Sequence, residues 1–392
     1  MASLLLPAIV IDRVRSLLSG MAGQSAKIDT IEPAASGWSA IPGESAWLAR
    51  VQFTSRSASG SVIAKTRRPA DHWRSGDTTT RERVSLELLT EWGCGVGPRL
   101  LGVDDQLHVI LLEDLGSGPA VEDLLVDRDR SAAIGALHDH ARTLATLQSA
   151  SLGHADVFYQ RLEANGLARA QDRGVVQIMP FSQRWQGLRA IVDARPYLPS
   201  PARAERDIER ILNWLENPGP FLTLSNGDFM PQNSRLVRGG VRLLDFEDAL
   251  YQHALLDAAH LRIPYAAAPC WSQLPLAEAA GLETTYRAAL ADACPAITDD
   301  QLYDEGMAMA VSAWAINRLT RLPKLEQQDV PHPMGYSRRG QQLDLLQSAS
   351  TSCAAARVLP DLRAWLDEAI IRLRRLWPEV APRQPDYPAL RG

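Results

Sequence analysis

The sequence predicts an α+β protein with two lobes, a small N-terminal lobe built on a sheet and a larger, mainly helical C-terminal lobe. The chain has 392 residues, which is more than one hydrophobic core usually accommodates. Short alternating or apolar runs fill residues 31–65, as expected for strands, whereas residues 275–375 have the periodicity of helices. These two regions lie on either side of a predicted hairpin within residues 224–249.

The composition excludes several classes of protein. Hydrophobic residues make up 46% and charged residues 22%, as in ordinary globular proteins. A net charge of −5 and a pI near 5.9 do not suggest a nucleic-acid partner. No segment approaches 18 uncharged apolar residues, so we expect no membrane span. The four cysteines are far apart and form no Cys-x-x-Cys pair, which argues against a disulfide framework or a zinc site and fits a reducing cytoplasm.

The most informative stretch contains two apolar runs, 221–224 and 241–244, and each ends in a cluster of polar residues. Gly239-Gly240 between them predicts a tight turn. The resulting hairpin would bring Asn233 and Asp245 together at its open end. Asp228 lies five residues before Asn233, so one loop can direct all three side chains to one point.

This cluster suits phosphoryl transfer. Mg²⁺ accepts sparse protein ligation by oxygen atoms, and Asn233 with Asp245 would supply an amide oxygen and a carboxylate. Asp228 would then accept the proton of an attacking hydroxyl. The alternative is a hairpin whose Asp and Asn residues only form turns and caps. The second Asp, placed directly after an apolar strand, favours phosphoryl transfer.

The same stretch resembles the catalytic loop of the aminoglycoside phosphotransferase family, which has the protein-kinase-like fold. In that family an Asn follows the catalytic Asp by five residues, and a strand then leads to a metal-binding Asp. Asp228, Asn233 and Asp245 occupy these places. Asn226 stands where the family usually has His, a residue that supports the loop.

The resemblance implies a bilobal protein-kinase-like fold with a small antiparallel-sheet N-lobe. Residues 1–30 would form a helical extension and residues 31–115 the nucleotide-binding N-lobe. Residues 116–392 would form the helical C-lobe, with the catalytic loop at 224–249 and helices that bind the acceptor. The loop over 36–45 would cover the nucleotide phosphates.

The resemblance also implies residues that bind the nucleotide. Lys65 ends an apolar strand and would hold phosphates, although Arg67 and Arg68 follow it directly. A glutamate on the helix predicted over 80–92 would orient this lysine. Counting back from Gly97 favours Glu82, and Glu87 remains the alternative.

Two further segments have predicted roles. Backbone groups of the hinge at Glu113 and Leu115 would bind the nucleobase. Asp257, in a helix predicted over 251–262, would support the catalytic loop. The histidines at 138, 140, 253 and 260 are interpreted as structural.

We therefore expect a cytoplasmic, Mg²⁺-dependent kinase that transfers phosphate from ATP or GTP to a small-molecule hydroxyl. Twelve acidic residues against five arginines between Phe221 and Glu305 would suit a cationic acceptor such as an aminoglycoside. A solvated helix surface explains this excess equally well. A sugar or amino-alcohol kinase, a protein kinase and a non-catalytic pseudokinase are the alternatives.

Overall fold

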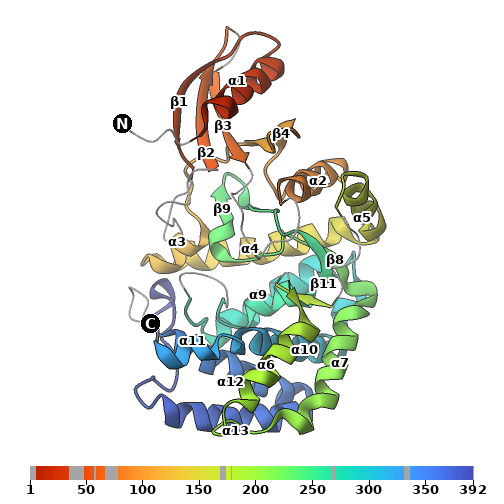
Figure 1. Ribbon diagram of the computed structural model, residues 1–392, viewed down its shortest axis with the longest axis vertical. Coiled ribbons are helices and arrows are strands. Elements are labelled where there is room, and N and C mark those ends of the chain that lie inside the picture. The colour runs from red at the N-terminus through yellow and green to blue at the C-terminus, as the bar shows by residue number, and fades with distance from the viewer. Residues whose placement is uncertain are drawn as a thin grey trace.

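The computed structural model describes residues 6–34, 48–56, 59–66, 78–167, 174–177, 179–265, 271–330 and 336–391. In these ranges the chain forms a small lobe that contains a sheet and a larger lobe of helices (Figure 1). The predicted α+β class and bilobal architecture are therefore confirmed.

A five-stranded antiparallel sheet forms the small lobe, in the spatial order β1-β2-β3-β5-β4. Its strands are β1 (Lys27–Pro33), β2 (Leu48–Thr54), β3 (Ser59–Thr66), β4 (Leu100–Asp104) and β5 (Val109–Glu113). The pattern in the sequence predicted β2 and β3 within residues 31–65 but not β4, which is short and contains a register shift between Leu100 and Gly102.

Two helices flank this sheet. Helix α1 (Ala8–Ala22) buries Val10, Val14 and Leu18 on one face, and these residues share a hydrophobic core with β2, β3 and β5. Spacings of four residues place the three side chains on one side of the helix, which is why α1 packs on the sheet. Helix α2 (Thr78–Glu91) joins the small lobe to the segment around Phe246, because Glu82 accepts a hydrogen bond from the amide of Phe246.

The large lobe is built from helices that pack around α10 (Figure 1). Nearly every residue of α10 from Gly306 onward is buried, because the helix contacts α6, α8 and α12. The helices of this lobe are α3 (Val121–Val126), α4 (Arg130–Ser151), α5 (Ala155–Ala164), α6 (Phe181–Asp193), α7 (Glu205–Glu216), α8 (Leu255–Ala258), α9 (Leu276–Leu290), α10 (Asp300–Leu319), α11 (Leu322–Gln327), α12 (Arg338–Ala356) and α13 (Pro360–Leu376).

Three short strand pairs complete the large lobe. They combine β6 (Val175–Val176) with β7 (Met179–Pro180), β8 (Leu222–Ser225) with β11 (Leu250–His253), and β9 (Ser234–Val237) with β10 (Gly240–Leu243). The prediction of a helix from residue 251 is wrong for β11. This segment pairs with β8 and satisfies the backbone groups of that buried strand, and the helix begins only at Leu255.

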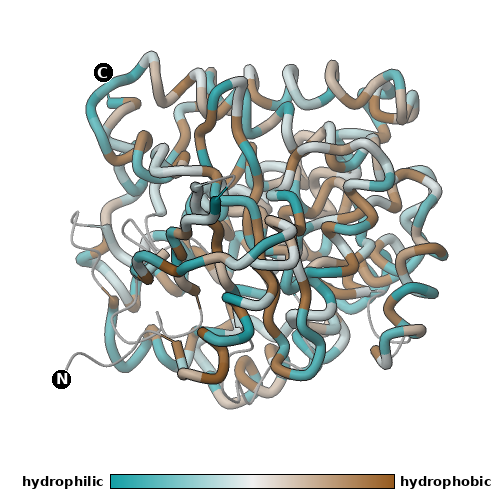
Figure 2. Tube along the Cα trace, turned by 90° about the horizontal axis from the view of Figure 1, so that it is seen from above, coloured by the Kyte–Doolittle hydropathy of each residue, from teal (hydrophilic) through white to brown (hydrophobic). Residues whose placement is uncertain are grey.

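Hydrophobic and hydrophilic residues alternate in short runs along the chain (Figure 2). None of the helices in the described part of the chain combines the length and the apolar composition that a membrane crossing requires.

Candidate active site

The predicted hairpin forms the centre of the site. β9 and β10 pair antiparallel, with Val237 opposite Gly240 and Ser234 opposite Leu243. Just beyond the last pair, the amide of Leu244 donates to the carbonyl of Asn233 at 2.8 Å. Asn233 therefore lies at the open end of the hairpin, beside the strand end that leads to Asp245.

Asp228 is held in place by this hairpin. The Nδ2 group of Asn233 donates to the Oδ2 atom of Asp228 at 2.8 Å and to its backbone carbonyl at 3.0 Å. One amide thus fixes both the carboxylate and the backbone of the preceding loop.

Asn226 ties the same loop to the far strand. It is 1% exposed, and its Nδ2 group donates to the carbonyl of Leu244 at 3.1 Å. In this way Asn226 supports the loop from the position where the family usually has His.

The backbone at the site is tightly constrained. Gly227 has a φ of +85°, and a Cβ atom at this position would lie 2.2 Å from the carbonyl oxygen of Asp248. Asp245 adopts a φ of +61°, a left-handed conformation that is uncommon outside glycine. Such strained residues persist where surrounding contacts hold them, and they are frequent at functional sites.

Lys65 is the cationic centre of the site. Its Nζ atom lies 2.6 Å from Glu82, 2.6 Å from Asp245 and 3.0 Å from Glu247. Burial lowers the pKa of Lys65, but Asp245 and Glu82 outweigh burial and raise the pKa above its ordinary value. The ammonium is therefore charged, and it joins β3 of the small lobe to the end of the hairpin in the large lobe.

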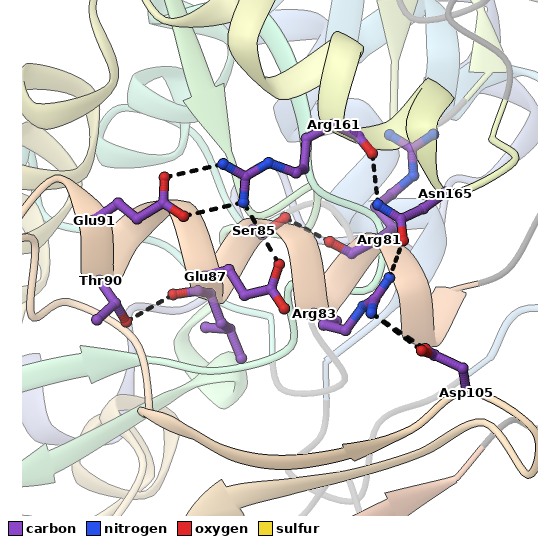
Figure 3. Close-up of polar contacts among 10 residues, drawn as sticks. Arg81, Arg83, Ser85, Glu87, Thr90, Glu91, Asp105, Arg161 and Asn165 are labelled. Carbon is purple, nitrogen blue, oxygen red and sulfur yellow. Dashed lines mark hydrogen bonds and ion pairs between the residues drawn. The ribbon is translucent and has the colours of Figure 1, made fainter.

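The partner of Lys65 on α2 is Glu82 and not Glu87. Glu82 is almost completely buried, and its Oε1 atom accepts a hydrogen bond from the amide of Phe246 at 3.4 Å. Glu87 points to another side of α2, where it lies 3.8 Å from Arg161 (Figure 3).

The charge balance of this cluster fits a divalent cation. The carboxylate oxygens of Glu82, Asp245 and Glu247 lie within 4.8 Å of one another, around one ammonium. Three carboxylates and one ammonium leave an excess of two negative charges when all are ionised. The side chain of Asn233 uses only its Nδ2 group in the hydrogen bonds of the described residues, so its Oδ1 atom is available as a ligand. Carboxylate and amide oxygens are ligands that Mg²⁺ accepts.

The predicted set of site residues did not include Glu247, which is 2% exposed and directly contacts Lys65. Its position two residues after Asp245, at the end of an apolar strand, was the available signal. The pattern alone did not show which of the acidic residues at 245, 247 and 248 points inward.

The hinge follows β5. The amide of Glu113 donates to the carbonyl of Arg99 at 2.9 Å, so this amide is already used within the protein. The next residue, Asp114, receives hydrogen bonds from Arg50 and Ser61 at 2.7 Å, which fix the start of the hinge. Leu115 follows in the connection to α3.

Asp257 lies buried next to the loop that carries Asp228. Gln252 donates to its carboxylate at 3.0 Å, and Ser225, at the start of the loop, forms a further hydrogen bond. Burial raises the pKa of Asp257 to about 7, although both hydrogen bonds lower it and the charge of Asp228 adds to the rise.

The buried histidines are poor proton acceptors. Burial lowers the pKa of His140, His253 and His260 to about 3. His140 stacks on Phe229, next to Asp228, with ring centroids 4.0 Å apart. The predicted phosphate loop over 36–45, together with Arg67 and Arg68, lies outside the described residues.

Four of the twelve acidic residues counted between Phe221 and Glu305 lie at the start of α10, namely those at 299, 300, 304 and 305. Asp299 caps the N-terminus of α10 by accepting from the amide of Leu302 at 2.9 Å. Asp300 pairs with Arg287 at 2.7 Å. The opposite end of α10, at Arg318, is the end near Asp228. At 1.5 Å per residue, the 18 residues between Asp300 and Arg318 span roughly 27 Å.

Neither protein-family models nor curated proteins gave a match to this chain. Among solved structures, a choline/ethanolamine kinase family protein from Mesorhizobium loti is similar, with 14% identity, a TM-score of 0.44 and coverage of 92% of this chain and 99% of the other. An ADP-bound aminoglycoside phosphotransferase has 13% identity, a TM-score of 0.44 and the same two coverages, 92% and 99%. A macrolide 2'-phosphotransferase from Brachybacterium faecium has 15% identity, a TM-score of 0.43 and coverage of 80% and 93%.

Proposed function

We propose that this protein is a kinase that transfers the γ-phosphate of a nucleoside triphosphate to the hydroxyl of a small molecule. The observation that carries the proposal is the convergence of Lys65, Asp228, Asn233 and Asp245 at the junction of the two lobes. Because the ion pair of Lys65 with Asp245 joins residues 180 positions apart in the sequence, the arrangement depends on the whole fold.

Asp228 serves as the base in this proposal. The hydroxyl oxygen attacks the γ-phosphorus, the bond from that phosphorus to the bridging oxygen breaks, and the hydroxyl proton passes to the carboxylate of Asp228. The hydrogen bonds from Asn233 orient this carboxylate before the acceptor binds. Catalysis of this kind depends on placement and on charge neutralisation, which a rigid loop favours.

Lys65, oriented by Glu82, would bind the α and β phosphates. Mg²⁺, held by Asn233 and Asp245 with Glu247 nearby, would neutralise the phosphate charge. Since the amide of Glu113 is already used, the amide of Leu115 is the hinge donor for a nucleobase. ATP is the first nucleotide to test, and GTP is the second.

A small-metabolite kinase and an antibiotic kinase share this chemistry and differ only in the acceptor. A pseudokinase is disfavoured, because Asn226 still supports the loop through its hydrogen bond to Leu244 and the sequence retains the carboxylates that this proposal assigns to catalysis and metal binding. Nothing in the geometry favours a protein substrate.

The test is the Asp228→Asn variant. We expect phosphate transfer from radiolabelled ATP to fall by about 10²- to 10⁴-fold, since a base that acts on the acceptor contributes this much. Binding of Mg·ATP, measured by calorimetry, should stay nearly unchanged because Asp228 does not contact the nucleotide in this scheme.

The matched control is Asp139→Asn, which changes an α4 carboxylate that pairs with Arg142. It should leave both transfer and binding as they are. Wild-type transfer by Asp228→Asn would show that Asp228 is only a turn residue and that the site is misassigned.

A further inference from the structure

A buried guanidinium lies near the catalytic loop, at the C-terminal end of α10. Arg318 is 4% exposed, and its Nε and Nη2 atoms have no hydrogen-bond partner among the described residues. Burying a charged donor without a partner is strongly unfavourable. A ligand that accepts hydrogen bonds from these atoms would remove this penalty.

Other arginines gather around this group. Burial lowers the pKa of Arg318, and the charges of Arg321, Arg338 and Arg184 lower it further, whereas Asp228 opposes them. Three positive charges and one negative charge thus act on a guanidinium that is itself positive. The four arginines come from α6, α10, the start of α11 and α12, so the fold assembles them from distant parts of the chain.

The neighbouring donors are also incompletely used. The Nε atom of Arg184 and the Nε2 atom of Gln342 are buried and have no hydrogen-bond partner in the parts of the chain that the structure describes. Gln342 follows Arg338 by four residues on α12, so the two side chains lie on the same face of that helix. In addition, Gln232 in the catalytic loop has a buried amide oxygen without a partner among these residues, which suits a hydroxyl donor.

We propose that the acceptor carries an oxyanion, a carboxylate or a phosphate, which Arg318 and Arg184 bind while its hydroxyl lies at Asp228. This inference rests on the proposed function for the role of the hydroxyl. The oxyanion site itself follows from the buried, unused donors and needs no assumption about catalysis.

A guanidinium presents its donors in a planar fork that matches a carboxylate or phosphate edge. A cationic acceptor would instead meet four arginines in a desolvated region, where like charges repel strongly. Arg338 is held by Gln341 at 2.7 Å and lies over Trp271 at 3.4 Å, so it supplies a fixed positive charge. The site therefore selects against a polycation such as an aminoglycoside.

The first experiment measures anion binding without nucleotide. Inorganic phosphate is titrated into the full-length protein at constant ionic strength, with chloride as the balancing anion, and the dissociation constant is measured by calorimetry. Saturable binding to the wild type is expected. Arg318→Gln and Arg184→Gln should each weaken it by about tenfold or more, because each removes donors to a charged group.

Three further variants locate this binding. Arg318→Lys keeps the charge but loses the fork, so it should bind phosphate more weakly than the wild type. Arg161→Gln is the matched control. Arg161 forms a bidentate pair with Glu91 of α2 (Figure 3), so this variant should bind phosphate normally. Lys65→Met removes the ammonium that would bind the nucleotide phosphates, so loss of phosphate binding in this variant would place the anion at the nucleotide site and contradict the inference. Because a substitution at the buried Arg318 can prevent folding, Arg184→Gln, which changes a half-buried residue, keeps the test decisive.

Competition then identifies the chemistry of the acceptor. D-Glycerate and glycerol 3-phosphate should each displace phosphate, and their relative strength separates a carboxylate site from a phosphate site. Glycerol and 2-aminoethanol should not displace it.

The inference is overturned if the wild type binds no phosphate, if Arg184→Gln binds it normally, or if 2-aminoethanol competes. A protein that binds phosphate through the arginines but transfers none from ATP would refute the proposed kinase and leave the oxyanion site standing.

Discussion

At the residue scale, the buried carboxylate of Asp257 connects the catalytic loop to protein stability. Its neighbours are Ser225 at the start of the loop, Gln252 on β11 and the charge of Asp228. Burial dominates, so the folded protein holds the proton of Asp257 up to about pH 7, whereas an unfolded aspartate releases it near pH 3.8.

This difference gives a pH dependence of definite sign. Between pH 3.8 and pH 7 the folded state binds one more proton at Asp257 than the unfolded state, so the free energy of unfolding falls as pH rises. The contribution is about 1.4 kcal/mol per pH unit, or roughly 2–3 kcal/mol between pH 5 and pH 7. Asp257→Asn should remove it, which urea unfolding at several pH values would show.

The control is Asp292→Asn, which changes an exposed carboxylate. It should have the same pH profile as the wild type. If the profile of Asp257→Asn also ran parallel to that of the wild type, Asp257 would be ionised in the folded protein.

The site residues that lie close together in the sequence could be predicted. Asp228, Asn233 and Asp245 span 18 positions, and one hairpin fixes their geometry. Glu82 could be chosen over Glu87 by counting, but the decisive fact is the direction of each side chain on α2, which depends on packing.

At the element scale, the sequence predicted the long helices, the hairpin and strands β2 and β3, and it missed β4 and β11. Helices α4, α10, α12 and α13 have sustained apolar periodicity, so local pattern determined them. The sequence of β11 has a helical pattern and no strand signal. Pairing with β8 overrides this pattern and gives the segment its strand conformation.

The catalytic loop depends on a close backbone approach at Gly227. Gly227→Ala would place a methyl group against the carbonyl of Asp248 and force an alanine into a φ of +85°. We expect this variant to lose at least 1 kcal/mol of unfolding free energy, roughly the strain at one such residue. It should also lose most phosphate transfer, because the loop that carries Asp228 must shift.

Gly135→Ala is the matched control in the interior of α4, where the added methyl group meets no atom within 4 Å. It should stabilise the protein by up to about 1 kcal/mol, because glycine is less favourable than alanine in a helix. Normal activity and stability of Gly227→Ala would mean that the loop tolerates displacement and that its geometry does not set the rate.

At the scale of the whole molecule, the fold groups charged residues in a way that their order along the sequence does not show. Counting from Phe221 to Glu305 finds an acidic excess, but several of these residues form ion pairs, such as Glu283 with Arg262 at 2.6 Å. The arginines at 184, 318, 321 and 338 lie outside that range, and only the packing of α6, α10 and α12 brings them together. No local count could reveal this basic cluster.

The acidic residues at the start of α10 should therefore have no influence on the acceptor. The variant neutralises Asp299, Asp300 and Asp304 to Asn and Glu305 to Gln, and the Asn at 299 preserves the helix cap. These positions are about 20 to 27 Å along α10 from Arg318. At physiological ionic strength exposed charges are screened over about 8 Å, so the KM for the acceptor should change by less than about twofold. The nucleotide KM should also stay constant, and circular dichroism would verify the helix content of the variant.

Arg184→Gln, assayed in parallel, should raise the acceptor KM. If neutralising the acidic residues raised it steeply instead, and salt did the same for the wild type, the acceptor would be a cation bound at the acidic end of α10.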